Sequence, residues 1–294
     1  MQFKGGGLFG AGALTGSIGV VTLNLAKINS DYSEYTIGEV LRIAVNSLEI
    51  KRKKIEELTK SGLYPYTQFY LRNIKEKTGK FWSNHFSTIG VVGGHEACYQ
   101  KGYKGVESKR GHNWMCSYLD RINDYLEKLQ KDSNTMWNLE ATPAESTAYS
   151  LAQKDGLGYQ YYTNSTNLPA DSQVNLKDAM IHQESLLQKY TGGSVFHIYI
   201  GNSISGDLTK AAIRTACENF KIPYFSIAPT FSICPTHGII HGERTKCGIC
   251  GTKTEIFKKI TGYIRPVESF NPGKKIEHSE RVLYKIGKEN NLNE

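Results

Sequence analysis

The feature that most constrains this chain is a cluster of four residues, near its carboxy-terminal end, that can bind a metal. Cys234-Pro-Thr-His237 and Cys247-Gly-Ile-Cys250 form two pairs separated by nine residues. A gap of two residues lets one tight turn direct two ligand atoms at a single ion, and two such turns complete a tetrahedron. The spacing therefore predicts a structural Zn²⁺ site whose four protein ligands leave no open position for catalysis. His241 is the alternative nitrogen ligand, at a longer spacing from Cys234.

The cysteine distribution and the lack of targeting signals favour a cytoplasmic protein. Three of the six cysteines fall within 17 residues, whereas a secreted protein would spread its cysteines as a disulfide framework. No apolar run reaches the roughly 18 residues that a membrane span requires, and no secretory signal opens the chain. The formal net charge of +8 is spread along the chain. It fits a solvated surface and would also suit nucleoside triphosphates, but it argues against a dedicated nucleic-acid surface.

Apolar runs of strand type alternate with amphipathic helices through the first two-thirds of the chain. The expected strands cover residues 17–25, 86–92, 194–200 and 224–228, and the expected helices cover 36–61, 114–131 and 209–221. Such alternation is typical of an α/β architecture with a mainly parallel sheet. We therefore expect a barrel-like part over residues 1–230, a zinc-binding module over 231–255, and a glycine-containing loop and tail over 256–294.

A second candidate site begins at Thr142. The sequence Thr142-Pro-Ala-Glu145 matches a capping box, with Thr142 as the N-cap of a helix over residues 143–154. The amides at such a helix start, around residues 144–147, can also receive phosphate groups. Capping and phosphate binding are compatible, so both interpretations of Glu145 stay open. Asn24 is a polar residue in an apolar strand and is either a satisfied strand-end side chain or a ligand contact.

The segment after the metal-binding residues contains Thr261-Gly262-Tyr263-Ile264. This sequence resembles the glycyl-radical loop of anaerobic (class III) ribonucleoside-triphosphate reductases. Further blocks resemble that family and follow one another in the family's order: Gly5–Leu25, Phe86–Gly90, Asn138–Glu145, Pro229–Gly238 and Phe270–Lys274. The resemblance therefore spans nearly the whole chain.

The resemblance implies both a fold and a radical site. The fold would be part of a ten-stranded α/β barrel of the glycyl-radical and ribonucleotide reductase type, followed by a small zinc ribbon and the radical loop. Gly262 would carry the radical, because delocalisation into both flanking amides needs a flat Cα that a β-carbon would crowd. The apolar neighbours Ile260, Tyr263 and Ile264 predict a buried loop tip, shielded from water and oxygen, which the zinc site would hold in place.

The resemblance also implies a reaction, its partners and its binding residues. An activase with an iron–sulfur cluster and S-adenosylmethionine would take a hydrogen atom from Gly262, and the glycyl radical would then generate a thiyl radical. The thiyl radical would start the reduction of a ribonucleoside triphosphate, with formate or a thiol protein as the reductant, in a homodimeric enzyme. Substrate would contact five residues: Asn24, Thr142, Ala144, Glu145 and Ser146.

One part of the family's machinery has no counterpart in this chain. The thiyl-forming cysteine of the family lies just upstream of the glycine-rich block Gly5–Gly12, and none of the six cysteines matches that position. The family's nucleotide-sensing domain and the first half of its barrel are also missing. We therefore expect a radical-bearing piece that a separate amino-terminal piece completes, or a truncated product. The alternatives are a non-catalytic zinc-ribbon binding module and a spare-part protein that restores a radical glycine to a damaged enzyme.

Overall fold

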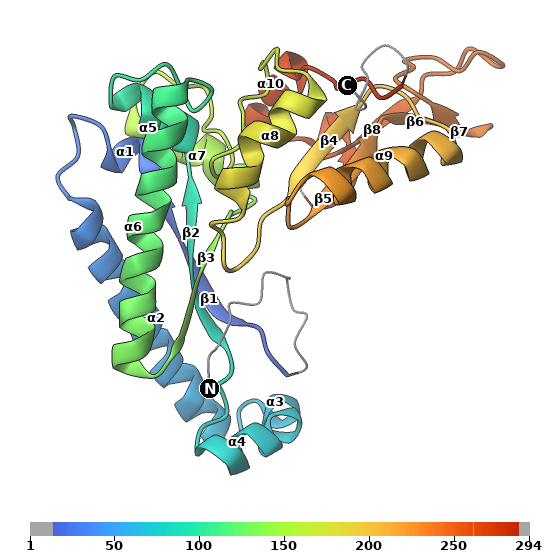
Figure 1. Cartoon of the computed structure of the whole chain (residues 1–294). Helices are drawn as coiled ribbons and strands as arrows, with labels where there is room; N and C mark the ends of the chain where they lie inside the picture. The colour runs from blue at the N-terminus through green and yellow to red at the C-terminus, as the bar shows by residue number, and fades with distance from the viewer. Residues whose placement is uncertain (1–13, 261, 288–294) are drawn as a thin grey trace. The chain divides into compact units, whose positions relative to one another are not determined.

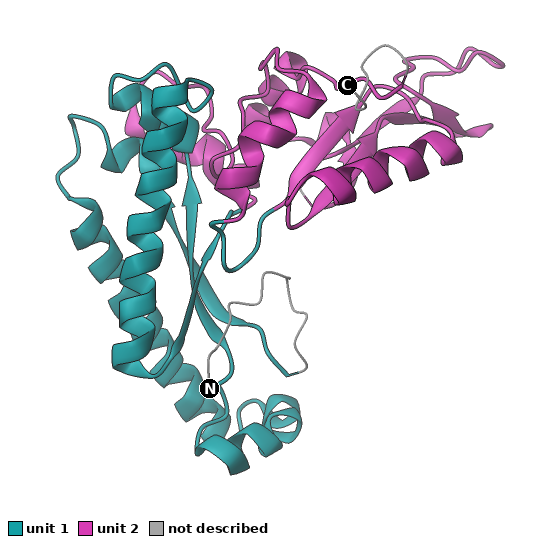
Figure 2. Ribbon diagram, viewed as in Figure 1, with its two compact units in different colours: residues 1–142, 189–194 teal, residues 143–188, 195–294 magenta. Residues whose placement is uncertain are grey.

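The computed structural model describes residues 14–260 and 262–287, which belong to two compact units (Figure 2). The first unit comprises Met1–Thr142 and Lys189–Ser194, and the second comprises Pro143–Gln188 and Val195–Glu294. The glycine-rich block over residues 5–12 and the residue Thr261, which contribute to the resemblance, lie outside the described residues. Among the described helices, none combines the length and the apolar character that a membrane span would need.

The first unit is built on a three-stranded parallel sheet, in the order β1-β2-β3 (Figure 1). The strands are β1 (Ser17–Asn24), β2 (Phe86–Val92) and β3 (Met136–Glu140). β2 is the central strand and nearly all of its residues are buried, as expected for a parallel strand that is covered on both faces. The helices of this unit are α1 (Leu25–Ile28), α2 (Ile37–Lys60), α3 (Pro65–Tyr70), α4 (Arg72–Thr78), α5 (Gly94–Gln100) and α6 (Lys109–Ser133).

Helix α2 shows how local sequence sets an element of this unit. A capping box fixes its start: the Thr36 amide donates to the Glu39 carboxylate at 2.7 Å, and the Glu39 amide donates to the Thr36 hydroxyl at 3.3 Å. Leu41 and Leu48 recur at helical spacing and are buried where α2 packs on β1. The prediction of a helix over residues 36–61 is therefore confirmed, with Thr36 and Ser61 as its two caps.

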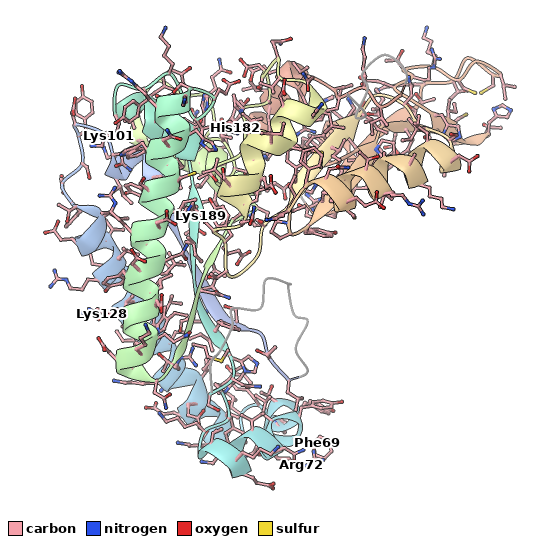
Figure 3. All side chains as sticks on the ribbon, in the orientation of Figure 1. Phe69, Arg72, Lys101, Lys128, His182 and Lys189 are labelled. Carbon is pink, nitrogen blue, oxygen red and sulfur yellow. The ribbon has the colours of Figure 1, made fainter. Side chains whose placement is uncertain are left out.

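The segment Lys189–Ser194 joins the first unit through polar contacts with α6 and β3. Lys189, labelled in Figure 3, forms an ion pair of 2.6 Å with Asp120, and its carbonyl accepts a hydrogen bond of 2.8 Å from Asn123. The hydroxyl of Thr191 accepts a hydrogen bond of 3.0 Å from the amide of Leu139 in β3. These contacts fix the segment to the sheet although the chain leaves and re-enters the unit.

The second unit contains a pair of parallel strands and a four-stranded antiparallel sheet. The parallel strands are β4 (Phe196–Ile200) and β5 (Phe225–Pro229). The antiparallel sheet has the order β7-β6-β8-β9, with β6 (Phe231–Cys234), β7 (Gly238–His241), β8 (Glu255–Lys259) and β9 (Ile264–Pro266). The helices are α7 (Glu145–Asp155), α8 (Leu176–Leu187), α9 (Gly206–Asn219), the 3₁₀ turn η1 (Val267–Ser269) and α10 (Pro272–Glu280).

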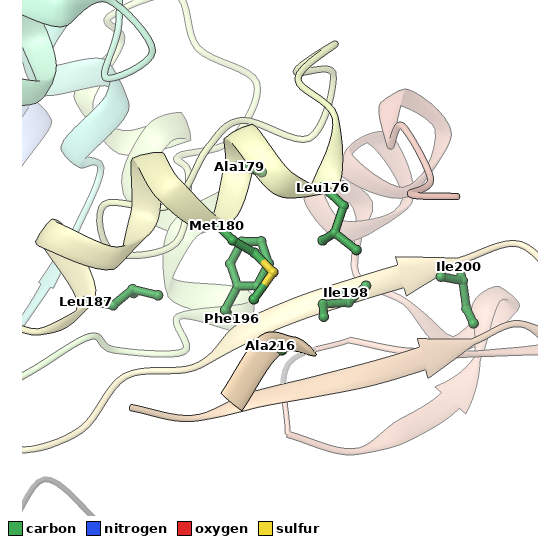
Figure 4. Close-up of a cluster of buried hydrophobic side chains, with 8 residues drawn as sticks. All are labelled: Leu176, Ala179, Met180, Leu187, Phe196, Ile198, Ile200 and Ala216. Atoms are coloured by element: carbon green, nitrogen blue, oxygen red, sulfur yellow. The ribbon is translucent and has the colours of Figure 1, made fainter. Parts of the chain in front are cut away.

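A hydrophobic core holds α8 and α9 against β4 (Figure 4). The side chains alternate along β4, so that its apolar face is buried and Ile198 at its centre is 3% exposed. Burial of each large side chain of this kind contributes about 1.5–3 kcal/mol. The buried members of the cluster are Leu176, Ala179, Met180, Leu187, Phe196, Ile198, Ile200 and Ala216.

The expected α/β class with parallel strands is confirmed, but the described residues show no closed barrel. They contain nine strands in three separate sheets. The alternation of strands and helices predicts that strands pair in parallel, and β1–β3 and β4–β5 do so. It does not determine closure, which requires strands that pair across both outer edges of a sheet.

Candidate functional site

The four predicted metal ligands come together in the second unit. Their ligand atoms all lie within 4.8 Å of one another. The Sγ atoms of Cys234 and Cys250 are 3.7 Å apart, and Nδ1 of His237 lies 3.7 Å from Cys234 Sγ and 3.5 Å from Cys247 Sγ. A tetrahedral Zn²⁺ with bonds of about 2.3 Å to sulfur and about 2.05 Å to nitrogen gives sulfur–sulfur edges of about 3.8 Å and sulfur–nitrogen edges of about 3.6 Å. The three measured edges therefore fit a zinc-centred tetrahedron.

Two tight turns of the backbone position these ligands. β6 ends at Cys234, which pairs with Gly238 at the start of β7, and Gly238 has a φ of 75° that favours glycine. The second turn is closed by the Gly251 amide, which donates to the carbonyl of Cys247 at 2.9 Å. The Ile249 amide also donates to Cys247 Sγ at 3.4 Å. The chain thus holds the ligand set with its own hydrogen bonds.

His237 belongs to the ligand group, whereas the alternative ligand His241 does not. His241 lies outside the group, because its Nδ1 is 2.9 Å from the hydroxyl of Ser203. At the other end of the cluster, hydrogen bonds from the side chain and the backbone of Thr252 lower the pKa of the Cys250 thiol to about 6. Three sulfurs and one imidazole nitrogen are a donor set of structural zinc sites.

Gly262 lies at the tip of the hairpin formed by β8 and β9. Lys259 pairs with Ile264 at its base, and the Ile260 amide donates to the Tyr263 carbonyl at 3.0 Å to close the turn. A β-carbon built on Gly262 would meet no described heavy atom within 4 Å. Alanine would therefore fit here without a clash.

The predicted burial of this loop tip is wrong for most of its residues. Ile260 is 1% exposed, but Gly262 is exposed, and Tyr263 and Ile264 are 41% and 54% exposed. The physical reason is that β9 is the edge strand of its sheet, so that one side of the hairpin has no neighbouring strand in the described chain.

The predicted capping box at Thr142 is also wrong. The N-cap of α7 is Ala144, and among the described residues no side chain caps this helix. The Thr142 hydroxyl instead lies 3.2 Å from the hydroxyl of Thr22 in β1, within the first unit. Because that contact draws Thr142 to the sheet, the helix begins at Glu145, with Ser146 in its first turn. Its first amides are left without a side-chain acceptor.

Asn24 acts as a helix cap in this structure. Its side-chain oxygen accepts a hydrogen bond of 3.1 Å from the Lys27 amide at the start of α1. This contact satisfies one end of the amide, as in the interpretation of Asn24 as a strand-end residue. A substrate contact for Asn24 stays a prediction.

Glu145 contacts the hairpin that carries Gly262. The Tyr263 hydroxyl donates to Oε2 of Glu145, and Arg265 Nη1 lies 3.8 Å from Oε1 of Glu145. The Arg265 guanidinium also lies 4.8 Å from the centre of the Tyr263 ring. The structure therefore joins one predicted substrate residue to the predicted radical loop, both within the second unit. The two segments are 118 residues apart, and nothing in the sequence pattern indicates their contact.

Tyr199 is a residue near the hairpin that the sequence interpretation missed. Its hydroxyl donates to the carbonyl of Ile260 at 2.7 Å. The alternation in β4 places Tyr199 and His197 on the face opposite the core, which is the signal that could have identified them. Burial, followed by the charge of Lys259, lowers the pKa of His197 to about 4, so that this imidazole is neutral at physiological pH.

Comparisons with known proteins agree with this arrangement. No curated protein sequence matches the chain. A solved structure described as an anaerobic ribonucleotide reductase has 23% identity and a TM-score of 0.72, and the match covers 92% of this chain and 45% of that one. The Thermotoga maritima anaerobic ribonucleotide reductase in complex with dATP and CTP has 22% identity and a TM-score of 0.66, with 90% and 45% covered.

At these identities the solved structures show a shared fold, and this chain spans about 45% of their length. The family assignment comes from a second comparison, in which the family model described as anaerobic ribonucleoside-triphosphate reductase matches residues 2–284. The matched region contains the cysteine and histidine cluster, the α7 start and the Gly262 hairpin. The chain belongs to the anaerobic ribonucleoside-triphosphate reductase family.

Proposed function

We propose that this chain is the radical-bearing part of an enzyme that reduces ribonucleoside triphosphates to deoxyribonucleoside triphosphates without oxygen. Gly262 would hold the radical. The observation that carries the proposal is the position of the Gly262 hairpin. Its strand β8 pairs with β6, which ends at the candidate zinc ligand Cys234, and its Tyr263 hydroxyl bonds to Glu145 of α7. The chain spans less than half of its solved relatives, so the complete reaction is proposed for an assembly that includes the rest of the barrel.

The proposed role of Cys234, His237, Cys247 and Cys250 is to hold a structural Zn²⁺ that stiffens the base of the hairpin. β8 begins five residues after Cys250, and it pairs with β6, which ends at Cys234. The rings of Phe231 and Phe257 stack across these strands at 5.6 Å, with an interplanar angle of 4°. An ion that fixes both ligand-bearing turns therefore also fixes β8, the strand that leads to Gly262. Bound zinc supplies four strong ligand bonds and no redox chemistry.

The proposed phosphate site is the start of α7. The first amides of this helix lack a side-chain cap in the described structure, and they carry the positive end of the helix dipole. Ala144 and Ser146 would bind through the backbone, whereas the negative Glu145 would face away from phosphate and keep its contacts with the hairpin. Thr142 and Asn24, from the first unit, are the remaining proposed substrate contacts.

In the proposed reaction, an activase that uses an iron–sulfur cluster and S-adenosylmethionine removes one hydrogen atom from Cα of Gly262. A cysteine on the complementary amino-terminal piece then passes a hydrogen atom to Gly262 and becomes the radical that attacks the ribose. The 2′ hydroxyl leaves as water, and formate or a thiol protein supplies the two electrons. The exposed Gly262 of the present structure suits access by the activase. The assembled enzyme is proposed to be a cytoplasmic homodimer that buries this tip.

The test is electron paramagnetic resonance on anaerobically activated protein. The chain is produced with the activase and the complementary amino-terminal piece, and a glycyl radical should give a doublet signal. Gly262→Ala should remove the doublet without unfolding the protein, because a β-carbon meets no described atom there. Gly206→Ala is the matched control, since a β-carbon at this site in α9 also meets no described atom. Absence of the doublet from fully activated wild-type protein would refute the proposal.

Exposure to air supplies a second readout. Oxygen should cleave the activated chain at Gly262 and release a fragment close to Tyr263–Glu294. A non-catalytic zinc-ribbon module would instead remain intact in air and bind nucleic acid with strong salt dependence. A spare-part protein would form the radical only with a full-length partner enzyme that has its own glycine domain.

A further inference from the structure

The carbonyl of Ile260 is held by a side chain from a distant part of the second unit. Tyr199, in β4, donates a hydrogen bond of 2.7 Å to this carbonyl. The Ile260 amide is also occupied, because it donates to the Tyr263 carbonyl at 3.0 Å. The Ile260 side chain is 1% exposed. The hairpin is therefore fixed at Ile260, two residues before Gly262.

Tyr199 is itself held through both its ring and its backbone. The Arg281 guanidinium lies 3.7 Å from the ring centre, a distance typical of a cation–π contact. Arg281 has a side chain that is 5% exposed, and its Nη2 donates to Glu277 at 2.5 Å. The Tyr199 carbonyl accepts a hydrogen bond of 2.8 Å from the Tyr284 amide. A side chain with these neighbours has little freedom to turn its hydroxyl away from the hairpin.

The environment also keeps the Tyr199 hydroxyl protonated. Burial raises the pKa of Tyr199 to about 12, because the phenolate would lose its hydration. Arg281 acts in the opposite direction, but burial is the larger effect. The hydroxyl therefore remains a donor at every pH at which the enzyme would work.

The same buried contacts extend to the start of α7. Glu277 pairs with Lys274, whose side chain is 2% exposed. With the Asn164 amide oriented so that both of its ends find a partner, its oxygen accepts from Lys274 at 2.9 Å and its nitrogen donates to the carbonyl of Ala144 at 2.8 Å. Glu145 follows in the chain and accepts the hydrogen bond from Tyr263. The hairpin is thus held on both sides of Gly262 by groups that belong to one connected set.

We propose that Tyr199 is a positioning residue for the radical chemistry: its hydrogen bond to Ile260 sets where the hairpin presents Gly262. This inference rests on the proposed function of Gly262. Of the two attachments, the one at Tyr199 is the more rigid. Its acceptor Ile260 is 1% exposed and its donor Tyr199 is partly buried, whereas Arg265 on the other side is half exposed. Loss of the Tyr199 hydroxyl should loosen the tip while the sheet and the metal cluster stay formed.

The first test compares Tyr199→Phe with Tyr284→Phe in the full chain, without activation. Both changes remove one hydroxyl and keep the ring, and of these two hydroxyls it is that of Tyr199 that bonds to the hairpin. Hydrogen exchange of the Ile260 amide reports opening of the turn. It should become about fivefold faster in Tyr199→Phe, as expected for one lost hydrogen bond, and should not change in Tyr284→Phe. Unchanged exchange in Tyr199→Phe, or equal acceleration in both variants, would overturn the proposal.

The second test uses the assembled and activated enzyme. Tyr199→Phe should lower kcat at least fivefold and leave KM for the nucleotide unchanged, because the hairpin and not the phosphate site is displaced. A rise in KM at unchanged kcat would contradict a positioning role. If wild-type protein forms no radical, the proposed function fails, and the exchange experiment still decides whether Tyr199 holds the hairpin.

Discussion

Replacing one histidine at a time should show which of His237 and His241 binds zinc. The structure places His237 Nδ1 within 3.7 Å of two cysteine sulfurs, whereas His241 contacts Ser203. Structural zinc sites contribute about 10–16 kcal/mol in apparent binding free energy. An equal share for each of four ligands is about 3 kcal/mol, or roughly a hundredfold in Kd. His237→Ala should therefore lose its zinc to a competing chelator at concentrations at which His241→Ala and wild type keep theirs.

The assay is the zinc content of the purified chain, measured by elemental analysis before and after dialysis against a graded chelator. Wild type should contain about one zinc per chain. Cys217→Ser is the matched cysteine control, because Cys217 is exposed and lies outside the ligand group. Zinc retention in His237→Ala, or zinc loss in Cys217→Ser, would refute the assignment of the ligands. A wild-type chain that never contains zinc would refute the site itself.

Three further predictions concern stability, and chemical denaturation tests each of them. Thr36→Ala should lower the free energy of unfolding by about 1 kcal/mol, because it removes the cap of α2; an unchanged value would contradict the capping box. Ile198→Ala should cost about 2–5 kcal/mol, because Ile198 is 3% exposed in the core; a cost under 1 kcal/mol would mean that the site collapses or is not buried. Burial, followed by the charge of Arg52, lowers the pKa of His85 to about 4. In the unfolded chain His85 has an ordinary pKa of about 6.5, so between these two values only the unfolded state binds the proton. The free energy of unfolding should therefore fall by about 2 kcal/mol between pH 7 and pH 5 because of His85. His85→Gln should lose that share of the pH dependence, and an identical pH profile would contradict the shift.

The elements that could be predicted from the sequence are those whose signals are local. The capping box at Thr36 and the glycine after Ser61 set both ends of α2. β2 matches its predicted range, because Phe86–Val92 is a β-branched run bounded by Gly93. The metal cluster is also local, since two short turns contain all four ligands.

The features that could not be predicted depend on contacts between distant residues. β3, from Met136 to Glu140, has neither an alternating pattern nor a β-branched run, and it forms because β2 supplies hydrogen bonds along its edge. The start of α7 differs from its prediction because Thr142 contacts Thr22, 120 residues earlier. The contact of Glu145 with Tyr263 spans 118 residues.

The exposure of the Gly262 hairpin depends on a different factor. Tyr263 and Ile264 are apolar enough to predict burial, yet both are exposed at the edge of the sheet. Residue type indicates what a side chain would gain from burial, but the neighbouring strand or subunit must be present to cover it. The proposed assembly supplies that cover, and the burial of Gly262 is then a property of the complex.

The measurement that tests the central claim most directly is the spectrum of the activated assembly after the chain has been made with glycine deuterated at Cα. One hydrogen remains on the Cα of a glycyl radical, and it splits the signal of unlabelled protein into two lines. The account predicts that this splitting collapses in the deuterated protein, and that Gly262→Ala gives no signal with either glycine. A doublet that persists after deuteration, or a signal that survives in Gly262→Ala, would contradict the assignment of the radical to Gly262.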